Sequence, residues 1–185
     1  MGNSIIDALR REHTHLRSVL GIVADVLTTL EAGRAGDFVL LANAVYYMRK
    51  FPGAVHHPKE DAIFERLAAA DPMWKKEVDK ARAQHREIYE LEDWIIEMAL
   101  NAPKPGTQSR ARLVEFGRHY LDLQRKHSEG EEKFLFQPAD QFLKPKDWKE
   151  IGEKFKAIDD PLFGVHPGER YELLYDHLMR AANGG

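Results

Sequence analysis

The sequence predicts an all-α protein, built as an up-down-up-down antiparallel four-helix bundle with a C-terminal helical appendage. Apolar residues recur at helical spacing over four long stretches, Gly, Pro and Asp residues separate these stretches, and no strand-like alternation persists. Four long helices with short connections favour an antiparallel bundle. We expect residues 1–137 to form the bundle and residues 138–185 to form an appendage packed on it.

The first two helices are defined by their capping residues. Ser4 can cap a first helix, which ends at the glycine-containing stretch Glu31–Asp37, and Asp37 can cap the second. The second helix contains Pro52 and Pro58, and a proline inside a helix costs about 3 kcal/mol. We therefore expect this helix to be kinked or divided, with a second piece from about His57 to Ala69.

The turn signal Asp71-Pro72 introduces the third helix, and a loop at residues 101–108 separates the third helix from the fourth. We expect the third helix to run from Met73 to about Leu100 and the fourth from Ser109 to about Phe136. After Gln137-Pro138, frequent Pro and Gly residues divide the chain, and short helices are expected at residues 146–156 and 169–179.

Composition excludes several classes of function. The chain has 185 residues, a formal net charge of −3 and no cysteine. It therefore lacks the basic excess of a nucleic-acid-binding protein and the thiolates of iron–sulfur or zinc-thiolate sites. No apolar run reaches the roughly 18 residues of a membrane span, and the first residues do not have the layout of a signal peptide. We expect a cytoplasmic monomer or homodimer that binds neither nucleic acid nor membrane.

Two histidines are followed by a glutamate four residues later, His56 by Glu60 and His127 by Glu131. Residues at this spacing share one helix face, so that an imidazole and a carboxylate can reach the same metal ion. At 1.5 Å per residue, one histidine from each helix falls roughly 14–20 Å from the same end of the predicted bundle. These four histidines are His13, His56, His85 and His127. Imidazole and carboxylate ligands without sulfur suit iron, manganese or zinc, and carboxylates that can bridge two ions favour a dinuclear iron centre.

Four sequence pieces carry a resemblance to a known family: "LRREH", "HHPKEDAIF", "AQHREI" and "RKHSEGEEKFLF". In this order they resemble the hemerythrin-like HHE cation-binding domains over about residues 5–137. The resemblance implies two iron ions with an oxo or hydroxo bridge, bridged also by Glu60 and Glu131 and bound terminally by His13, His56, His85 and His127. It implies a non-heme diiron protein that binds dioxygen or senses oxygen, iron or redox state, or alternatively an oxidoreductase acting on peroxide, dioxygen or nitric oxide. Manganese or zinc fits the same ligands.

One position departs from the family pattern. Oxygen-carrying hemerythrins have a second histidine four residues after the first on the third helix, whereas here Tyr89 follows His85. Tyr89 and His57 are the candidates to complete the site, by ligation or by hydrogen bonding beside it. Pro58 favours an extended backbone at His57. Among the remaining histidines we expect His119 to lie in the interior or at an interface. Glu129 and Glu132 are expected to be solvated, and the alternative for Glu132 is a supporting contact beside the site.

Overall fold

The computed structural model describes residues 4–101, 104, 106–155, 160–164 and 168–182. Every regular element in these ranges is helical, which confirms the predicted all-α class. Within the same ranges, no helix has the length and apolar character that crossing a membrane requires.

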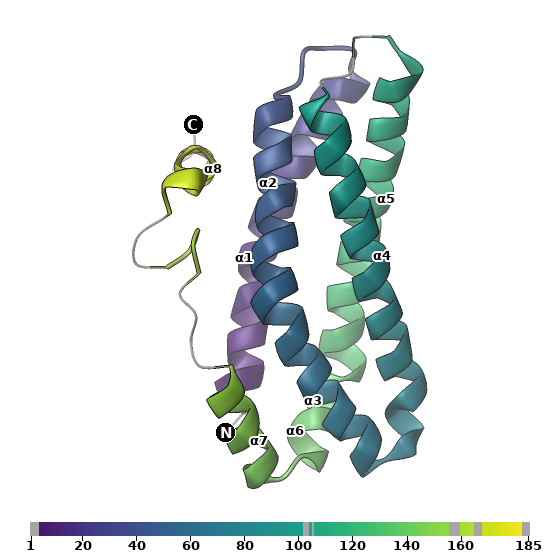
Figure 1. Cartoon of the computed structure of the whole chain (residues 1–185), viewed down its shortest axis with the longest axis vertical. Coiled ribbons are helices and arrows are strands. Elements are labelled where there is room, and N and C mark those ends of the chain that lie inside the picture. The colour runs from purple at the N-terminus through teal and green to yellow at the C-terminus, as the bar shows by residue number, and fades with distance from the viewer. Residues whose placement is uncertain (1–3, 102–103, 105, 156–159, 165–167, 183–185) are drawn as a thin grey trace.

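Four long helical segments lie side by side (Figure 1). They are α1 (Ser4–Glu31), α2 (Phe38–Phe51) continued by η1 (Pro52–His56) and α3 (His57–Ala70), α4 (Lys75–Leu100) and α5 (Gln108–Phe134). Both α1 and α4 pack against α2 and α5. The end of α1, the start of α2, the end of α4 and the start of α5 lie at one end of this group, and the turn between α3 and α4 lies at the other, as Figure 1 shows. We call these four segments the bundle.

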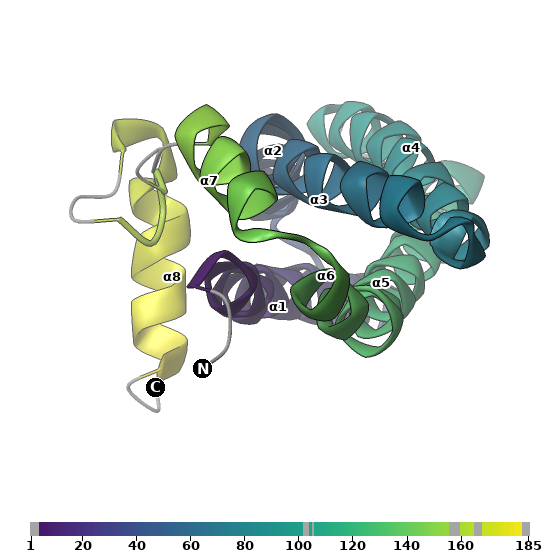
Figure 2. The same ribbon diagram turned by 90° about the horizontal axis from the view of Figure 1, so that it is seen from below.

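The shorter elements cover the outside of the bundle. Helices α6 (Phe136–Phe142) and α7 (Pro145–Lys154) lie at the end where α1 begins (Figure 2). Helix α6 contacts α3 and α5, and α7 contacts α3. The 3-10 turn η3 (Glu169–Tyr171) leads into α8 (Glu172–Ala182), which packs beside α1 and α2. The two short helices predicted in the appendage therefore correspond to α7 and to η3 with α8.

Helix α6 was not among the predicted helices. At Leu135 the backbone leaves the ideal helical geometry (φ −119°), so that α5 ends and α6 starts in a new direction. Phe136 and Ala139 are fully buried in an apolar cluster with α3 residues. Burial of these side chains thus outweighs the local turn signal of Gln137-Pro138. The predicted domain boundary between residues 137 and 138 falls inside α6.

Aspartate side chains begin two of the segments, as the sequence predicts. The Oδ1 atom of Asp37 accepts a hydrogen bond from the Leu40 N–H at 2.8 Å at the start of α2. The Oδ1 atom of Asp71 accepts from the Met73 N–H at 2.9 Å and starts the 3-10 turn η2 (Pro72–Trp74) before α4. Both carboxylates satisfy amide groups that otherwise have no partner within the helix.

The predicted interruption of the second helix is a π-helical turn and not a break. The His57 N–H donates to the Pro52 carbonyl, five residues earlier, and Pro58 lies in the first turn of α3. His57 has helical angles (φ −60°, ψ −40°), so the expected extended backbone at this residue is wrong. The helix continues because the π turn has already changed the hydrogen-bond pattern before Pro58, whose missing N–H therefore costs little. As a result both His56 and His57 are buried, with 1% and 2% exposure.

The buried polar side chains form a layer between two apolar clusters. One cluster joins the half of the bundle near the α1–α2 connection, and the other joins the start of α1 to α3, α6 and α7. Between them lie the histidines and glutamates that the sequence singled out. The apolar clusters hold the bundle together on both sides of this layer and keep bulk water away from it.

Candidate metal centre

All six predicted ligands and His57 are buried in a single group. They are His13 on α1, His56 at the end of η1, His57 and Glu60 on α3, His85 on α4, and His127 and Glu131 on α5. Every long segment of the bundle therefore contributes at least one side chain. The π turn explains why the second segment contributes two neighbouring histidines.

Glu60 lies at the centre of the group. Its Oε1 atom is 3.1 Å from Nε2 of His56 and 3.3 Å from Nε2 of His13. Its Oε2 atom is 3.6 Å from Nε2 of His85, on the neighbouring helix α4. The two oxygens of one carboxylate thus face histidines on different sides, which is the arrangement that a bridging carboxylate needs.

Glu131 occupies the corresponding position on α5. Its Oε2 atom lies 3.3 Å from Nε2 of His127 and 3.6 Å from Nε2 of His13. Its Oε1 atom lies 3.6 Å from Nε2 of His85. Both carboxylates therefore contact histidines of more than one segment.

The donor atoms form two groups compact enough for metal ions. One group contains His13, His56 and Glu60, and the other contains His57, Glu60, His85 and His127; within each group the donor atoms lie within 4.8 Å of one another. Glu60 belongs to both groups. The side chains present therefore suit two neighbouring ions that share a carboxylate.

The inward-facing donor atoms lack partners within the described part of the protein. Both carboxylate oxygens of Glu60 and of Glu131 are buried without a hydrogen bond, as are the Nε2 atoms of His13, His85 and His127. Leaving so many polar atoms unsatisfied in the interior is costly. Cations would satisfy all of them, and a set of imidazole nitrogens and carboxylate oxygens suits iron, manganese or zinc. The residues therefore fit the metal centre that the sequence predicts.

The outward-facing Nδ1 atoms of His13 and His56 have carboxylate hydrogen-bond partners. Nδ1 of His13 lies 2.8 Å from Oε1 of Glu132, and Nδ1 of His56 lies 2.7 Å from Oε2 of Glu12. Nδ1 of His85 is 3.4 Å from Oδ1 of Asp61. Outer carboxylates of this kind hold the proton on Nδ1 and aim Nε2 at a metal ion. The candidate supporting role of Glu132 agrees with this contact.

The structure brings His57 into the ligand group, with Tyr89 behind it. The Tyr89 hydroxyl lies 2.8 Å from Nδ1 of His57, so that Nε2 of His57 is left for the interior. Tyr89 is thus one layer farther out than the histidines. His119, in contrast, is exposed and pairs with Glu87 at 2.9 Å, so the expected interior position of His119 is wrong.

The electrostatics divide the histidines into two kinds. Burial and the neighbouring His85 hold the pKa of His57 well below its ordinary value, and burial also lowers the pKa of His127. Burial opposes the charged form of His13 as well, but the nearby carboxylates of Glu131, Glu132 and Glu60 raise the pKa of His13 well above its ordinary value. The surroundings of His57 and His127 thus favour the neutral imidazole that a metal ligand needs, whereas those of His13 favour the charged form, with which a metal ion would compete.

The sequence analysis missed a group of three hydrogen-bonded side chains near the histidines, Glu92 on α4 and Tyr120 and Gln124 on α5. The Tyr120 hydroxyl donates to Oε1 of Glu92 at 2.9 Å, and Nε2 of Gln124 donates to the Tyr120 oxygen at 3.2 Å. All three side chains are buried. Glu92 follows His85 by seven residues, and Tyr120 precedes His127 by seven residues. Because seven residues make about two helical turns, this spacing could have predicted that both side chains lie on the same helix faces as the histidines.

Glu12 was also missed, although it directly precedes His13. Its two oxygens contact Nδ1 of His56 and the ammonium of Lys59. Neighbouring helix residues point about 100° apart, so Glu12 faces the α2–α3 segment while His13 faces the interior. Residue spacing within one helix cannot predict this contact, because Glu12 is on α1 and its partners His56 and Lys59 are on the second segment.

Taken with the fold, the site defines an all-helical protein with a buried histidine–glutamate group that can hold metal ions. The sequence model of the family described as the Hemerythrin HHE cation binding domain matches residues 4–139. The chain belongs to this family, which confirms the resemblance given by the ordered histidine and glutamate motifs. Comparisons with curated proteins and with solved structures found no match.

Proposed function

We propose that the protein is a non-heme diiron protein, built on an up-down-up-down four-helix bundle, that binds dioxygen or senses oxygen, iron or redox state. The observation that carries this proposal is the shared position of Glu60, whose two oxygens face the His13–His56 side and the His85 side. A site for one metal ion does not require a carboxylate whose two oxygens face two separate groups of histidines. Membership of the family supports the metal, and the iron identity is part of the proposal.

The two ions would be held unequally. His13 and His56 would bind one ion, and three histidines, His57, His85 and His127, would bind the other, with Glu60 and Glu131 between them. Fewer chain donors on the His13–His56 side leave more room there for a small ligand. When bound, two iron ions supply the redox chemistry for binding or reducing dioxygen, nitric oxide or peroxide.

A small pocket adjoins the histidines and limits what can reach them. Its volume is about 10 Å³, close to the space that one water molecule needs. Leu16 and Leu20 are the apolar part of its lining, and Arg17, Gln124 and Ser128 are the polar part beside the histidines. A pocket of this size favours a diatomic molecule or peroxide over any larger organic substrate.

The direct test is metal analysis combined with an absorption spectrum recorded first without oxygen and then with oxygen. We expect about two irons per chain, as in other dinuclear bundles, and a visible band that changes reversibly on oxygenation. Glu60→Gln should lose most of the metal, whereas Glu129→Gln, at an exposed position on α5, should keep it. Less than about one metal ion per chain in the unchanged protein contradicts the diiron proposal.

The alternative enzymatic function has its own support. Burial raises the pKa of Glu92 to about 8, so that this carboxyl group carries a proton at neutral pH. Its partner Gln124 forms part of the pocket beside the histidines. A protonated carboxyl next to the ligand pocket suits the reduction of nitric oxide, which takes up protons and electrons, and can relay a proton during the decomposition of peroxide, which consumes none overall. Gas evolution from peroxide, or consumption of nitric oxide, at a rate that Glu92→Gln lowers would favour the enzyme.

A further inference from the structure

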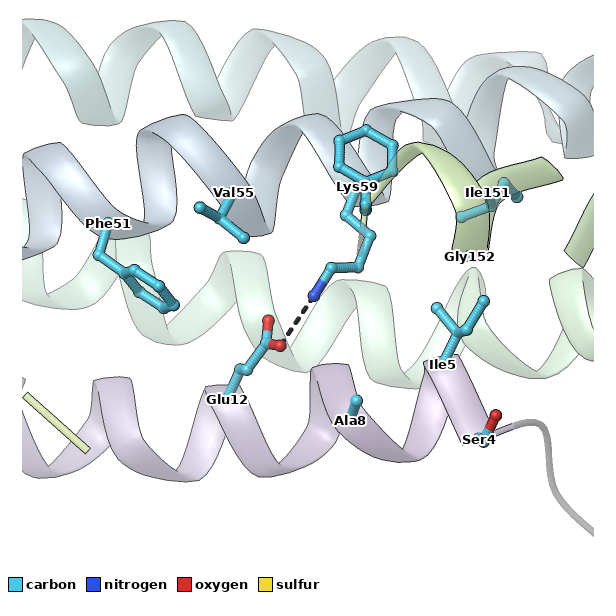
Figure 3. Close-up of a pocket in the computed structure, with 10 residues that line it drawn as sticks. Ser4, Ile5, Ala8, Glu12, Phe51, Val55, Lys59, Ile151 and Gly152 are labelled. Atoms are coloured by element: carbon cyan, nitrogen blue, oxygen red, sulfur yellow. Dashed lines mark hydrogen bonds and ion pairs between the residues drawn. The ribbon is translucent and has the colours of Figure 1, made fainter. Parts of the chain in front are cut away.

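A larger pocket lies on the other side of Glu12, between α1, the η1–α3 turn and the appendage helix α7 (Figure 3). Its volume is about 210 Å³. Most of the wall is apolar and consists of Ile5, Ala8, Phe51, Val55, Ile151 and Phe155, and Ser4 and Gly152 complete it. A cavity of roughly 150 Å³ with apolar walls accepts benzene, so this one has room for a small substituted ring. We call it the Lys59 pocket.

The polar floor of the Lys59 pocket is one ion pair. The Lys59 ammonium donates to Oε1 of Glu12 at 2.8 Å, and Figure 3 shows the Lys59 chain extending across the pocket toward that carboxylate. The Lys59 side chain is only 10% exposed. An ammonium has three N–H donors, and the contact with Glu12 engages one of them. The floor therefore offers donors to an oxygen atom that enters the pocket.

The Lys59–Glu12 ion pair at the floor disfavours the binding of charged ligands. Lys59 and Glu12 compensate each other, so an added carboxylate would face Glu12 and an added ammonium would face Lys59 without a counter-charge. A hydroxyl group has no such penalty, because it accepts from Lys59 and donates to a Glu12 oxygen. We propose that the Lys59 pocket binds a small uncharged amphiphile, a phenol or alcohol with an apolar body about the size of a cresol.

Glu12 also connects this pocket to the metal group. Its other oxygen, Oε2, lies 2.7 Å from Nδ1 of His56. A hydroxyl that competes for Glu12 changes the partner of a histidine ligand, and this coupling, unlike the binding itself, rests on the proposed diiron function. Coupling between two sites is reciprocal, so the metal state should change the affinity for the amphiphile by the same factor.

Calorimetric titration of the full chain with p-cresol tests the binding, with p-toluate and toluene as charged and apolar analogues. We expect p-cresol to bind at least about tenfold more tightly than p-toluate, which is the range of one charge-assisted hydrogen bond. Lys59→Met should remove about this factor for p-cresol and leave toluene unchanged. Equal affinities for the three compounds would overturn the proposal.

Gly152 on α7 provides a variant that fills the pocket. Among the residues that the structure describes, a Cβ atom there would meet only the end of the Ile5 side chain, at 3.7 Å, so a leucine can extend into the pocket. Gly152→Leu should abolish p-cresol binding, while Gly21→Leu, on an open face of α1, should not. Helical circular dichroism verifies that both variants fold, and unchanged p-cresol binding to folded Gly152→Leu would contradict the assigned site.

The coupling is tested on the metal-loaded protein, with metal content measured separately. We expect p-cresol to shift the visible absorption of the loaded protein and expect Gly152→Leu to remove this shift. A shift that persists in Gly152→Leu means that the phenol binds at the metal itself and overturns the coupling. Titration of metal-free protein separates the two proposals, because binding to the Lys59 pocket does not need iron.

Discussion

The Tyr89 hydroxyl is hydrogen-bonded to Nδ1 of His57 at 2.8 Å, and the two residues come from neighbouring segments of the bundle. Tyr89 is at the position where an oxygen-carrying hemerythrin has a histidine ligand. In the structure α3 supplies a further histidine instead: His57 lies in one of the groups that could hold a metal ion, and Tyr89 is its hydrogen-bond partner. The two departures in the sequence, a doubled histidine on one segment and a tyrosine on another, thus compensate each other.

Tyr89→Phe tests whether this hydrogen bond orients His57. The variant keeps the ring but removes the hydrogen bond to His57, and loss of such an outer partner lowers metal affinity by roughly tenfold to a hundredfold. Titration with iron(II) under anaerobic conditions measures the change. Tyr46→Phe is the control, because Tyr46 contacts Lys50 and Arg170 through its ring. Unchanged iron affinity in Tyr89→Phe would show that His57 needs no help from the hydroxyl.

His57→Ala should affect one ion more than the other. His57 belongs to the group with His85 and His127 but not to the group with His13 and His56. We therefore expect the iron content to fall by about half, whereas Glu60→Gln, which removes the shared carboxylate, should lose both ions. Metal analysis after desalting measures both variants, and exposed His119→Ala is the control. Equal losses in His57→Ala and Glu60→Gln would indicate that the ions do not bind separately.

The helices and the histidine layer were predictable because their signals are local or periodic. Asp37 and Asp71 are capping residues of a kind that acts within one turn, and both act as predicted. Ligand depth follows from the constant rise of a helix, so His13 and His85 could be placed in one layer before any coordinates were known.

Features that depend on contacts between segments were not predictable. Whether the helix breaks at Pro52 or passes through a π turn depends on the packing of His56 and His57 inside the bundle, which the sequence pattern does not encode. Helix α6 forms because Phe136 is buried against α3, and the contact between Glu12 and Lys59 joins α1 to α3. Each of these contacts joins residues that are distant in the sequence.

Metal removal should lower thermal stability. The buried carboxylates of Glu60 and Glu131 and the histidines around them lose their shared cations when a chelator removes the metal. A ligand present at a hundred times its Kd stabilises the folded state by about 2.7 kcal/mol, which corresponds to roughly 5–10 °C in Tm for a chain of this size. Differential scanning calorimetry before and after chelation measures the shift, and restoring iron should reverse it. An unchanged Tm would mean that the metal does not contribute to the stability of the bundle.

Glu92 should make stability depend on pH in a direction opposite to that of a typical carboxylate. Burial raises the pKa of Glu92 from 4.5 in the unfolded chain to about 8 in the folded one, despite the hydrogen bond from Tyr120. Between these values the folded state holds a proton that the unfolded state releases. Stability therefore falls as the pH rises through this window, by at most about 1.4 kcal/mol per pH unit, and the loss is complete above pH 8.

Glu92→Gln isolates this effect, because the amide keeps a hydrogen-bond acceptor for Tyr120 and cannot ionise. Denaturant unfolding at several pH values from about 5 to 9 gives the free-energy difference between the variant and the unchanged protein. We expect this difference to favour Glu92→Gln increasingly up to pH 8 and then to stay constant. The other titrating groups cancel because both proteins contain them, and Glu97→Gln, at an exposed site on the same helix, controls for the lost charge. Parallel stability curves would mean that Glu92 is already ionised in the folded protein, and that Tyr120 and Gln124 then stabilise a buried carboxylate instead of a neutral acid.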